Sequence, residues 1–500
     1  MSSIPISLGF GVMRAILSSQ QPRALMKKSL ERCNRCGKRP IDIFFDECLG
    51  IKHKKCIVCT SIVSALKFFT FVTLRALNSS QDSLVKALSV PYWRKGLTST
   101  IKGLAWFGVT KPFVTGSPLF VVWNFTNRCN LRCKHCYQNA SASLPTELTT
   151  GEALRVVKEL SDADVSSIAF SGGEPLARQD FFEVANSARD SGMYVTVASN
   201  GTLITRDVAK RLAKTIHYAE ISLDGVNPKT HDEFRGIPGS WDRAVSAIKY
   251  LTEEGVTVGV ATTVTRNNIS EIQRMVDFLE ELGVDYFICF NFIPTGRATG
   301  IVNDDPSPPE REEFLRYLYK RMVLNMLYNK KLKIYTTAPQ FARVGLEMRE
   351  EVVKEVCALN PTAPCIKPII PTTHYANIPG ITPEVAEFIG GCGAGRVYAA
   401  ISPEGDVQPC VFMPIKLGNL RHKKFEEIWL NSSILNDLRD RNKLKDGCGI
   451  CPYKFVCGGC RARAYGYFGD YLMPDPGCIR RVYEKPVFTL QPQILTSSRR

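Results

Sequence analysis

The chain has 500 residues, of which 44% are apolar, so it can bury a large core and is expected to form two or three domains. Its 18 cysteines fall mostly in C-x2-C or C-x3-C groups, which indicates metal ligation in a reducing compartment and argues against a disulfide framework. The first 20 residues contain no recognisable secretory signal, so we expect a cytoplasmic protein.

The net charge of +16 is concentrated near the N-terminus. Residues 1–115 carry 18 Lys and Arg against 5 Asp and Glu, and therefore hold +13 of that charge. A basic extension of this kind favours anionic surfaces, either a membrane or a nucleic acid. The rest of the chain is close to neutral.

Residues 1–60 are expected to be an irregular, cysteine-rich segment similar to a zinc ribbon. Two C-x2-C pairs stand 19 residues apart, a spacing typical of zinc sites. We favour structural zinc over another iron–sulfur cluster here. A nucleic-acid interface is disfavoured, because the segment lacks interleaved stacking aromatics and a recognition helix. The predicted ligands are Cys33, Cys36, Cys56 and Cys59.

Residues 61–115 are basic and rich in aromatic residues, and they are expected to form amphipathic helices. The apolar run at 62–77 is interrupted by Lys67 and Arg75, and it is shorter than the ~20 residues that a membrane-spanning helix needs. Tryptophan beside Lys or Arg, as at Trp93, is typical of helices that lie at a membrane surface. Two interpretations stay open: peripheral association with the inner face of the membrane, and a helical appendage packed on the rest of the chain.

Strand and helix patterns alternate six times between residues 116 and 297. A capping box at Thr149 to Glu152 opens the first helix. Strand–helix repetition with right-handed crossovers predicts a parallel sheet in an α/β fold. The six predicted strands are Leu119–Phe125, Ser166–Phe170, Tyr194–Ala198, Tyr218–Leu223, Thr257–Val264 and Tyr286–Phe292.

Three cysteines follow the first predicted strand with C-x3-C-x2-C spacing: Cys129, Cys133 and Cys136. A closed zinc site needs four protein ligands, whereas a [4Fe–4S] cluster held by three leaves one iron open. The motif resembles that of the radical S-adenosylmethionine (SAM) superfamily. The resemblance implies a partial (βα)6 TIM-like barrel, whose cluster on these cysteines cleaves SAM reductively to a 5′-deoxyadenosyl radical. The alternative is a zinc knuckle with a distant fourth ligand.

A second motif, Ser171-Gly-Gly-Glu-Pro175, follows the second predicted strand. Its glycines let the backbone approach a ligand, and its carboxylate can accept an ammonium group. The matching segment of radical SAM proteins binds the methionyl amino group of SAM. The resemblance also implies contacts beside the third cysteine and at the ends of the third and fourth strands, although those positions suit ordinary turns too. The predicted SAM-binding residues are His135, Gly172, Gly173, Glu174, Pro175, Ser199, Asn200, Ser222 and Asp224.

Residues 298–391 are expected to be a connecting helical region, and residues 486–500 a tail. Residues 392–485 form a cysteine-rich module that is similar to the SPASM module, which carries auxiliary [4Fe–4S] clusters after radical SAM barrels. By position, one cluster would be ligated by Cys448, Cys451, Cys457 and Cys478. A second would be ligated by Cys392, Cys410 and Cys460, with Cys357, Cys365 or an open iron as the fourth position. Zinc is the alternative, since both metals use thiolates.

The Cys457–Cys460 pair departs from the usual SPASM pattern, because two residues separate it instead of three. That variant also occurs in relatives that act on tetrapyrroles.

Together the motifs predict a radical SAM oxidoreductase or bond-forming enzyme that abstracts hydrogen from a substrate C–H bond. It would take a small-molecule or lipid substrate and an electron donor such as ferredoxin or flavodoxin. Because residues 61–115 suit docking on an anionic membrane, we favour a membrane lipid and a tetraether- or calditol-type modification. The alternatives are tetrapyrrole side-chain decarboxylation in heme synthesis, peptide or protein modification and, from another class, a zinc-rich nucleic-acid-binding or scaffold protein.

Overall fold

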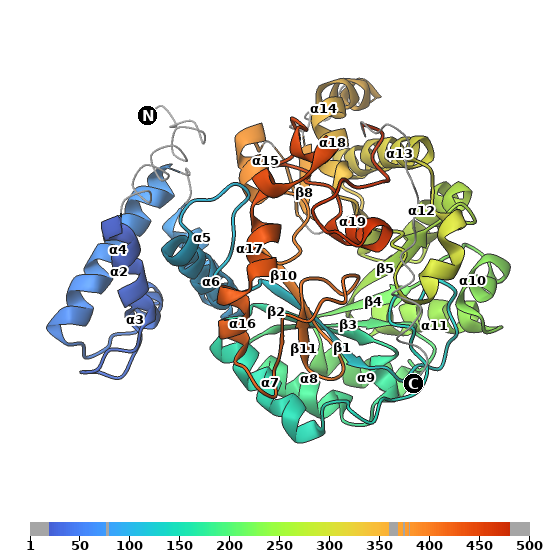
Figure 1. Cartoon of the computed structure of the whole chain (residues 1–500). Coiled ribbons are helices and arrows are strands. Elements are labelled where there is room, and N and C mark those ends of the chain that lie inside the picture. Colours follow the sequence, from blue (N-terminus) through green and yellow to red (C-terminus); the bar gives the residue numbers. More distant parts are fainter. Residues whose placement is uncertain (1–19, 77–79, 360–368, 374–375, 380, 481–500) are drawn as a thin grey trace.

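The computed structural model describes residues 20–76, 80–359, 369–373, 376–379 and 381–480. Figure 1 shows a group of N-terminal helices (blue) beside a barrel of strands and helices (cyan to yellow), with the C-terminal module (orange to red) against the barrel. The predicted tail and Cys365 lie outside the described residues.

The N-terminal part is helical, and its helices are α2 (Gln20–Leu30), α3 (Pro40–Cys48), α4 (Ile57–Ala76), α5 (Gln81–Leu88) and α6 (Pro91–Phe107). This corrects the expectation of an irregular segment for residues 20–60, whereas residues 1–19 lie outside the described residues. Helix α4 also crosses the predicted boundary at 60/61. Its buried residues Cys59, Ile62, Val63 and Leu66 recur at helical spacing and pack in a separate apolar core with α3.

Helix α6 packs against the barrel through polar contacts. The Nζ of Lys95 donates to the Ser161 carbonyl at 2.9 Å, and the Ser166 hydroxyl donates to the Tyr92 carbonyl at 2.7 Å. These contacts match the interpretation of a packed helical appendage. Across the described chain, no helix combines the length and apolarity needed to span a bilayer.

The barrel strands lie side by side in chain order and pair in parallel. They are β1 (Phe120–Thr126), β2 (Ser167–Gly172), β3 (Tyr194–Ser199), β4 (Tyr218–Ser222), β5 (Thr257–Val264) and β6 (Tyr286–Asn291). The helices between them are α7 (Thr150–Asp162), α8 (Phe181–Asp190), α9 (Arg206–Thr215), α10 (Pro228–Arg235), α11 (Ser240–Glu253) and α12 (Ile272–Glu281), with 3-10 turns at Pro175–Ala177 and Ile269–Glu271. The α/β partial barrel is confirmed.

The sheet extends beyond six strands at both edges. Strand β7 (Lys333–Thr336) pairs in parallel with β6, within the region expected to be helical. Its four residues are too few to stand out between two long helical patterns. The remaining elements of this region are a 3-10 segment at Gly296–Asp304, α13 (Pro308–Leu327), α14 (Gln340–Leu359), β8 (Ile369–Thr373), β9 (Ala376–Pro379) and α15 (Pro383–Ile389).

The C-terminal module continues the same sheet, because β10 (Tyr398–Ile401) pairs in parallel with β1. Strands β11 (Asp406–Gln408) and β12 (Gly418–Asn419) follow in antiparallel order. The module also contains α16 (Phe425–Asn431), α17 (Ser433–Arg439), a 3-10 turn at Arg441–Lys443, α18 (Asp446–Gly449) and α19 (Arg461–Phe468). Its cysteines are therefore held rigidly against the barrel.

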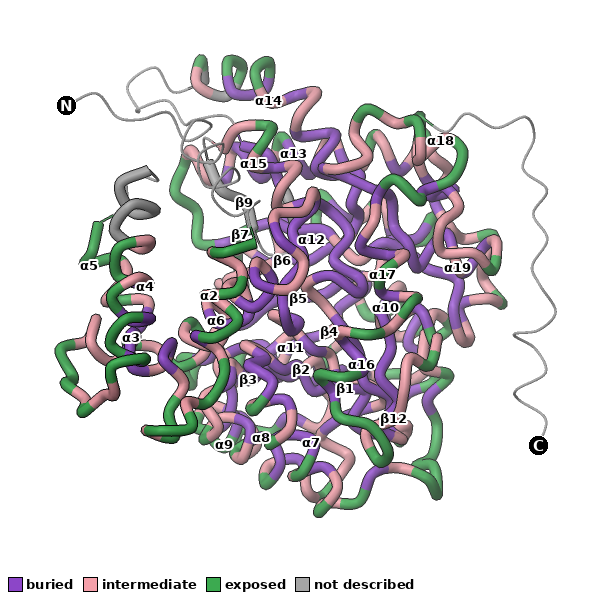
Figure 2. Tube along the Cα trace, turned by 60° about the vertical axis from the view of Figure 1, so that its left-hand side comes forward, coloured by how far each residue is buried: buried purple, intermediate pink, exposed green. Residues whose placement is uncertain are grey.

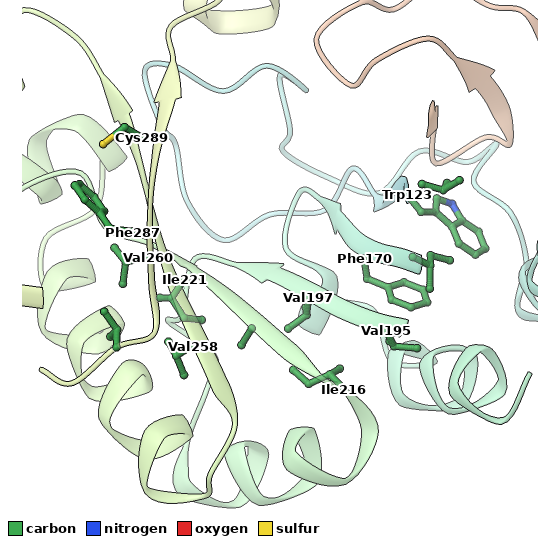
Figure 3. Close-up of a cluster of buried hydrophobic side chains, with 14 of the residues drawn as sticks. Trp123, Phe170, Val195, Val197, Ile216, Ile221, Val258, Val260, Phe287 and Cys289 are labelled. Carbon is green, nitrogen blue, oxygen red and sulfur yellow. The ribbon is translucent and has the colours of Figure 1, made fainter. Parts of the chain in front are cut away.

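Alternate residues of each barrel strand pack outward against the helices. Figure 3 shows this layer, with Trp123, Phe170, Val195 and Val197 among its side chains. Cys289 is fully buried here, as expected of a core cysteine. Figure 2 shows buried residues gathered along the strands and exposed residues on the surrounding helices and loops. The other residues of each strand face the barrel interior, where they can line a site.

Candidate active site

The loop that carries the three barrel cysteines follows β1 and is clamped from two sides. On one side, the amide of Lys134 donates to the Phe234 carbonyl at 2.9 Å. On the other, Arg297 donates from Nε to the Cys133 carbonyl at 2.9 Å and from its amide to the Cys136 carbonyl at 2.9 Å. These three contacts hold the cysteine loop between the end of α10 and the segment after β6.

The spacing of the barrel thiols fits a multi-iron cluster better than a single metal ion. Tetrahedral zinc–thiolate bonds of about 2.3 Å place sulfurs about 3.8 Å apart. Among the described residues, only the four N-terminal cysteines bring three or more candidate ligand atoms within 4.8 Å of one another. The three barrel thiols are therefore farther apart than a single ion requires. Burial raises the pKa of Cys129 to about 11, so ionisation of this thiol needs the positive charge of a metal.

The two glycines after β2 pack against the chain just ahead of Cys129. Gly172 has a φ of +113°, and a Cβ there would lie 2.7 Å from the Thr126 carbonyl oxygen. A Cβ on Gly173 would overlap the Arg128 carbonyl. Both glycines line the cavity described below. The absence of side chains on these two glycines thus lets the cysteine loop pack closely and also lets a ligand approach the backbone.

Glu174 is buried and is not among the residues that line the cavity, and its contact with SAM stays a prediction. Its buried carboxylate accepts hydrogen bonds from the Ser199 hydroxyl at 2.9 Å and from the Asn200 amide at 2.8 Å. Burial raises its pKa to about 7. The turn at Gly172 directs this side chain toward β3, where it positions Ser199 and Asn200. Those two residues do line the cavity.

Pro175 is buried at the start of a 3-10 turn and also does not line the cavity.

Asp224 is likewise buried behind the cavity, whereas Ser222 lines it. The Asp224 carboxylate accepts from Arg235 Nε at 2.6 Å and from the Thr263 amide at 2.8 Å. Arg235 itself lines the cavity, with its Nη1 3.7 Å from the Cys133 sulfur. No sequence motif marks Arg235 or Arg297, because Arg235 ends α10 and Arg297 follows β6 outside any recognisable pattern.

His135 lines the cavity and stacks on Phe234, with ring centroids 4.1 Å apart and an interplanar angle of 13°. Burial lowers its pKa well below the usual value, so the ring is neutral. Its buried Nδ1 has no hydrogen-bond partner in the described structure. An unpartnered nitrogen beside the cysteine loop fits a site built for a polar ligand such as SAM.

One cavity of about 960 Å³ occupies the barrel interior. Along β3 its lining runs from the first residue, Tyr194, to the last, Ser199, a span of about 16 Å. The N-terminal helices close the end near the strand starts with Leu84, Ala87, Leu88, Trp93 and Leu97. The other end contains Cys129, Cys133, Cys136, Cys392, Cys410 and Cys460.

The other auxiliary cysteines line a separate small cavity of about 30 Å³: Cys448, Cys451, Cys457 and Cys478. The structure thus divides the seven auxiliary thiols into the two groups that position along the chain suggested. Cys357 is disulfide-bonded and lines neither cavity, so its place as a fourth ligand of the second group stays an untested alternative.

The four N-terminal thiols lie within 4.8 Å of one another: Cys33, Cys36, Cys56 and Cys59. The Cys36 and Cys59 sulfurs are 3.3 Å apart, which fits a single tetrahedral ion. Backbone hydrogen bonds from Arg35 and Cys36 lower the pKa of Cys33 to about 6. Cys56 and Cys59 lie at the start of α4, so a helix supports this site, which differs from a β-stranded zinc ribbon.

Comparison with known proteins matches two families. Residues 123–279 match the radical SAM superfamily, and residues 392–452 match the SPASM iron–sulfur cluster-binding domain. The AdoMet-dependent heme synthase of Methanosarcina barkeri is 36% identical over 375 residues, which cover 74% of this chain and 99% of that protein. The mycofactocin maturase MftC of Mycobacterium tuberculosis is 28% identical, over 73% of this chain and 83% of that protein.

A solved structure of SuiB from Streptococcus suis, bound to S-adenosylmethionine, superposes with a TM-score of 0.59 at 18% identity. The superposition covers 88% of this chain and 93% of SuiB. At this identity the likeness concerns the fold, which the two chains share.

Proposed function

Since the chain belongs to the radical SAM superfamily and carries a SPASM iron–sulfur domain, we propose that it abstracts hydrogen from an unactivated C–H bond of a long apolar substrate, a membrane lipid. Cluster-bound SAM supplies the 5′-deoxyadenosyl radical for this chemistry. Cys129, Cys133 and Cys136 would hold the cluster. His135, Gly172, Gly173, Ser199, Asn200 and Ser222 line the cavity where SAM would bind.

The observation that carries the proposal is the long cavity with an apolar far end. Leu84, Leu88, Trp93 and Leu97 line that end, together with the rings of the tyrosines that begin β3, β4 and β6, so its lining is mostly but not wholly apolar. Each CH₂ group that a lipid chain buries there contributes about 0.8 kcal/mol. A saturated chain offers no polar group for recognition, so a fitted apolar channel is the means of placing one of its C–H bonds beside the SAM site.

The charged residues of the cavity also disfavour an anionic substrate, because Glu220 lines it as well. Of the described residues that line it, only Arg235 and Arg297 are lysines or arginines. Arg235 pairs with Asp224, and Arg297 donates to the Cys133 and Ala140 carbonyls. A substrate with several buried carboxylates would therefore lack free cations to offset its desolvation.

Tetrapyrrole side-chain decarboxylation is the second candidate, because the similarity to a heme synthase favours it. The mycofactocin maturase similarly keeps peptide modification open. These relatives give the lipid proposal no support, so it depends on the cavity and the N-terminal helices. Peripheral membrane association and cytoplasmic location stay part of the proposal, as does structural zinc on the four N-terminal thiols.

The test is turnover of the reconstituted protein under anaerobic, reducing conditions. SAM is offered with either a membrane-lipid extract or iron coproporphyrin III, and 5′-deoxyadenosine and product masses are measured. We expect a lipid species to lose hydrogen in step with 5′-deoxyadenosine formation, and Cys133→Ala to form neither. Loss of carboxyl groups from the porphyrin, with unchanged lipids, would replace the proposal with the second candidate.

A further inference from the structure

Two buried arginines lie between the two groups of auxiliary cysteines. Arg441 is 2% exposed and donates from Nη2 to the Cys392 carbonyl at 2.7 Å. Arg461 is fully buried, with its Nη2 3.7 Å from the Cys448 sulfur. Arg441 therefore contacts a predicted ligand of the group that contains Cys392, and Arg461 contacts one of the group that contains Cys448.

Neither guanidinium forms an ion pair with a carboxylate among the described residues. Arg461 donates otherwise to backbone carbonyls, including those of Tyr471 and Met473. The Nε of Arg441 is buried without a partner. Burying an unpaired cation costs several kcal/mol, so a fold that keeps two of them needs negative charge nearby.

The short Cys457–Cys460 spacing makes room for this pair. Gly458 and Gly459 have φ values of +68° and +62°. A Cβ on Gly458 would lie 2.6 Å from Arg441 Cζ, and a Cβ on Gly459 would lie 2.6 Å from Arg461 Nη2. The two glycines thus let both guanidinium groups approach the loop that joins one cysteine group to the other.

We propose that Arg441 and Arg461 act as buried counter-cations of the auxiliary clusters and raise the reduction potentials of both clusters. Thiolate ligands give such clusters negative charge, and cluster potential depends on net charge and on hydrogen bonds to sulfur. Cationic neighbours stabilise the reduced, more negative form. The inference is independent of the substrate proposed above, since it concerns only the clusters.

The experiment compares Arg441→Met, Arg461→Met and the matched control Arg439→Met in the full chain. Among the described residues Arg439 is also buried without a carboxylate partner, but it donates to the Gly395 and Trp429 carbonyls and stacks on Phe107 and Trp429, and none of these partners is a cysteine. Iron and sulfide content are measured first. Midpoint potentials then follow from redox titrations monitored by electron paramagnetic resonance, in a background where the barrel cysteines are alanine.

We expect both test variants to shift auxiliary-cluster signals to lower potential, with the larger shift of the Cys448 group in Arg461→Met. Arg439→Met should leave the potentials unchanged. Unshifted potentials at full iron content would overturn the proposal.

If a methionine variant loses iron, the corresponding lysine variant tests whether the lost positive charge is responsible. Lysine keeps the charge without the planar guanidinium. Retained iron at near wild-type potential supports the role of charge, whereas equal loss of iron in the lysine variant overturns it.

Discussion

Arg235 places its Nη1 3.7 Å from the sulfur of Cys133, while its Nε donates to Asp224 at 2.6 Å. One side chain thus connects a predicted cluster ligand to a carboxylate buried behind the cavity. Because Arg235 is the last residue of α10, its contacts hold the C-terminal end of this helix against the cysteine loop.

Removal of this arginine should destabilise the protein by leaving Asp224 buried and unpaired. We expect Arg235→Met to lower the free energy of unfolding by about 3–5 kcal/mol, measured by urea denaturation. Adding Asp224→Asn should recover much of that loss, because the uncompensated charge is gone. Equal instability of the single and double variants would contradict the pairing.

A methyl group at Gly296 should dislodge the cysteine loop. Gly296 has a φ of +63°, and a Cβ there would lie 2.5 Å from the Cys136 carbonyl oxygen. We expect Gly296→Ala to bind less iron at the barrel cysteines, as measured by iron analysis. The control is Gly283→Ala, which has a φ of +67° but no atom within 4 Å of its Cβ. The same iron loss in both variants would show that backbone strain alone is responsible.

Glu174 should make stability depend on pH near neutrality. Burial raises its pKa to about 7 in the folded state, above the value of about 4.3 in an unfolded chain. The folded state therefore holds this proton more tightly. The resulting stability is fully present below pH 4.3 and is lost as pH rises through 7, by up to about 4 kcal/mol.

Glu174→Gln should flatten this dependence. The measurement is the urea unfolding free energy of metal-free protein at pH 5 and pH 8, compared between wild type and variant. An unchanged difference between the two pH values would assign the dependence to other groups.

The N-terminal metal site should be separable from the barrel cluster. We expect Cys59→Ser to lose one equivalent of metal and to expose residues 20–76 to proteolysis, while barrel iron stays constant. Cys48→Ser is the matched control, because Cys48 belongs to the same core but not to the four-thiol group. Elemental analysis of both variants checks the expectation, and equal metal loss in the two would contradict it.

Sequence patterns located the six barrel strands closely, because each is a short apolar run between segments of helical periodicity, the first of which opens with a capping box. Thr257–Val264, for example, has the same bounds in prediction and structure. Motif spacing also selected cysteines that gather around the cavity. The pattern could not reveal Arg235, whose role depends on contacts between the end of α10 and the loop after β1. Nor could it show that the Glu174 carboxylate bonds Ser199 and Asn200, since those contacts join the turn after β2 to the end of β3.

The apolar far end of the cavity should select the substrate chain without affecting SAM cleavage. Leu97 lines this end from α6, far from the cysteine loop along the strands. We expect Leu97→Trp to fill part of the channel and so to shift turnover toward shorter chains, several-fold or more, with unchanged 5′-deoxyadenosine formation in the absence of substrate. Ile101→Trp is the control, since Ile101 lies on the same helix and, like Leu97, packs against the N-terminal core, but does not line the cavity. Product analysis with lipids of graded chain length gives the measurement. If both variants process all chain lengths as the wild type does, the α6 end of the cavity is not the substrate channel.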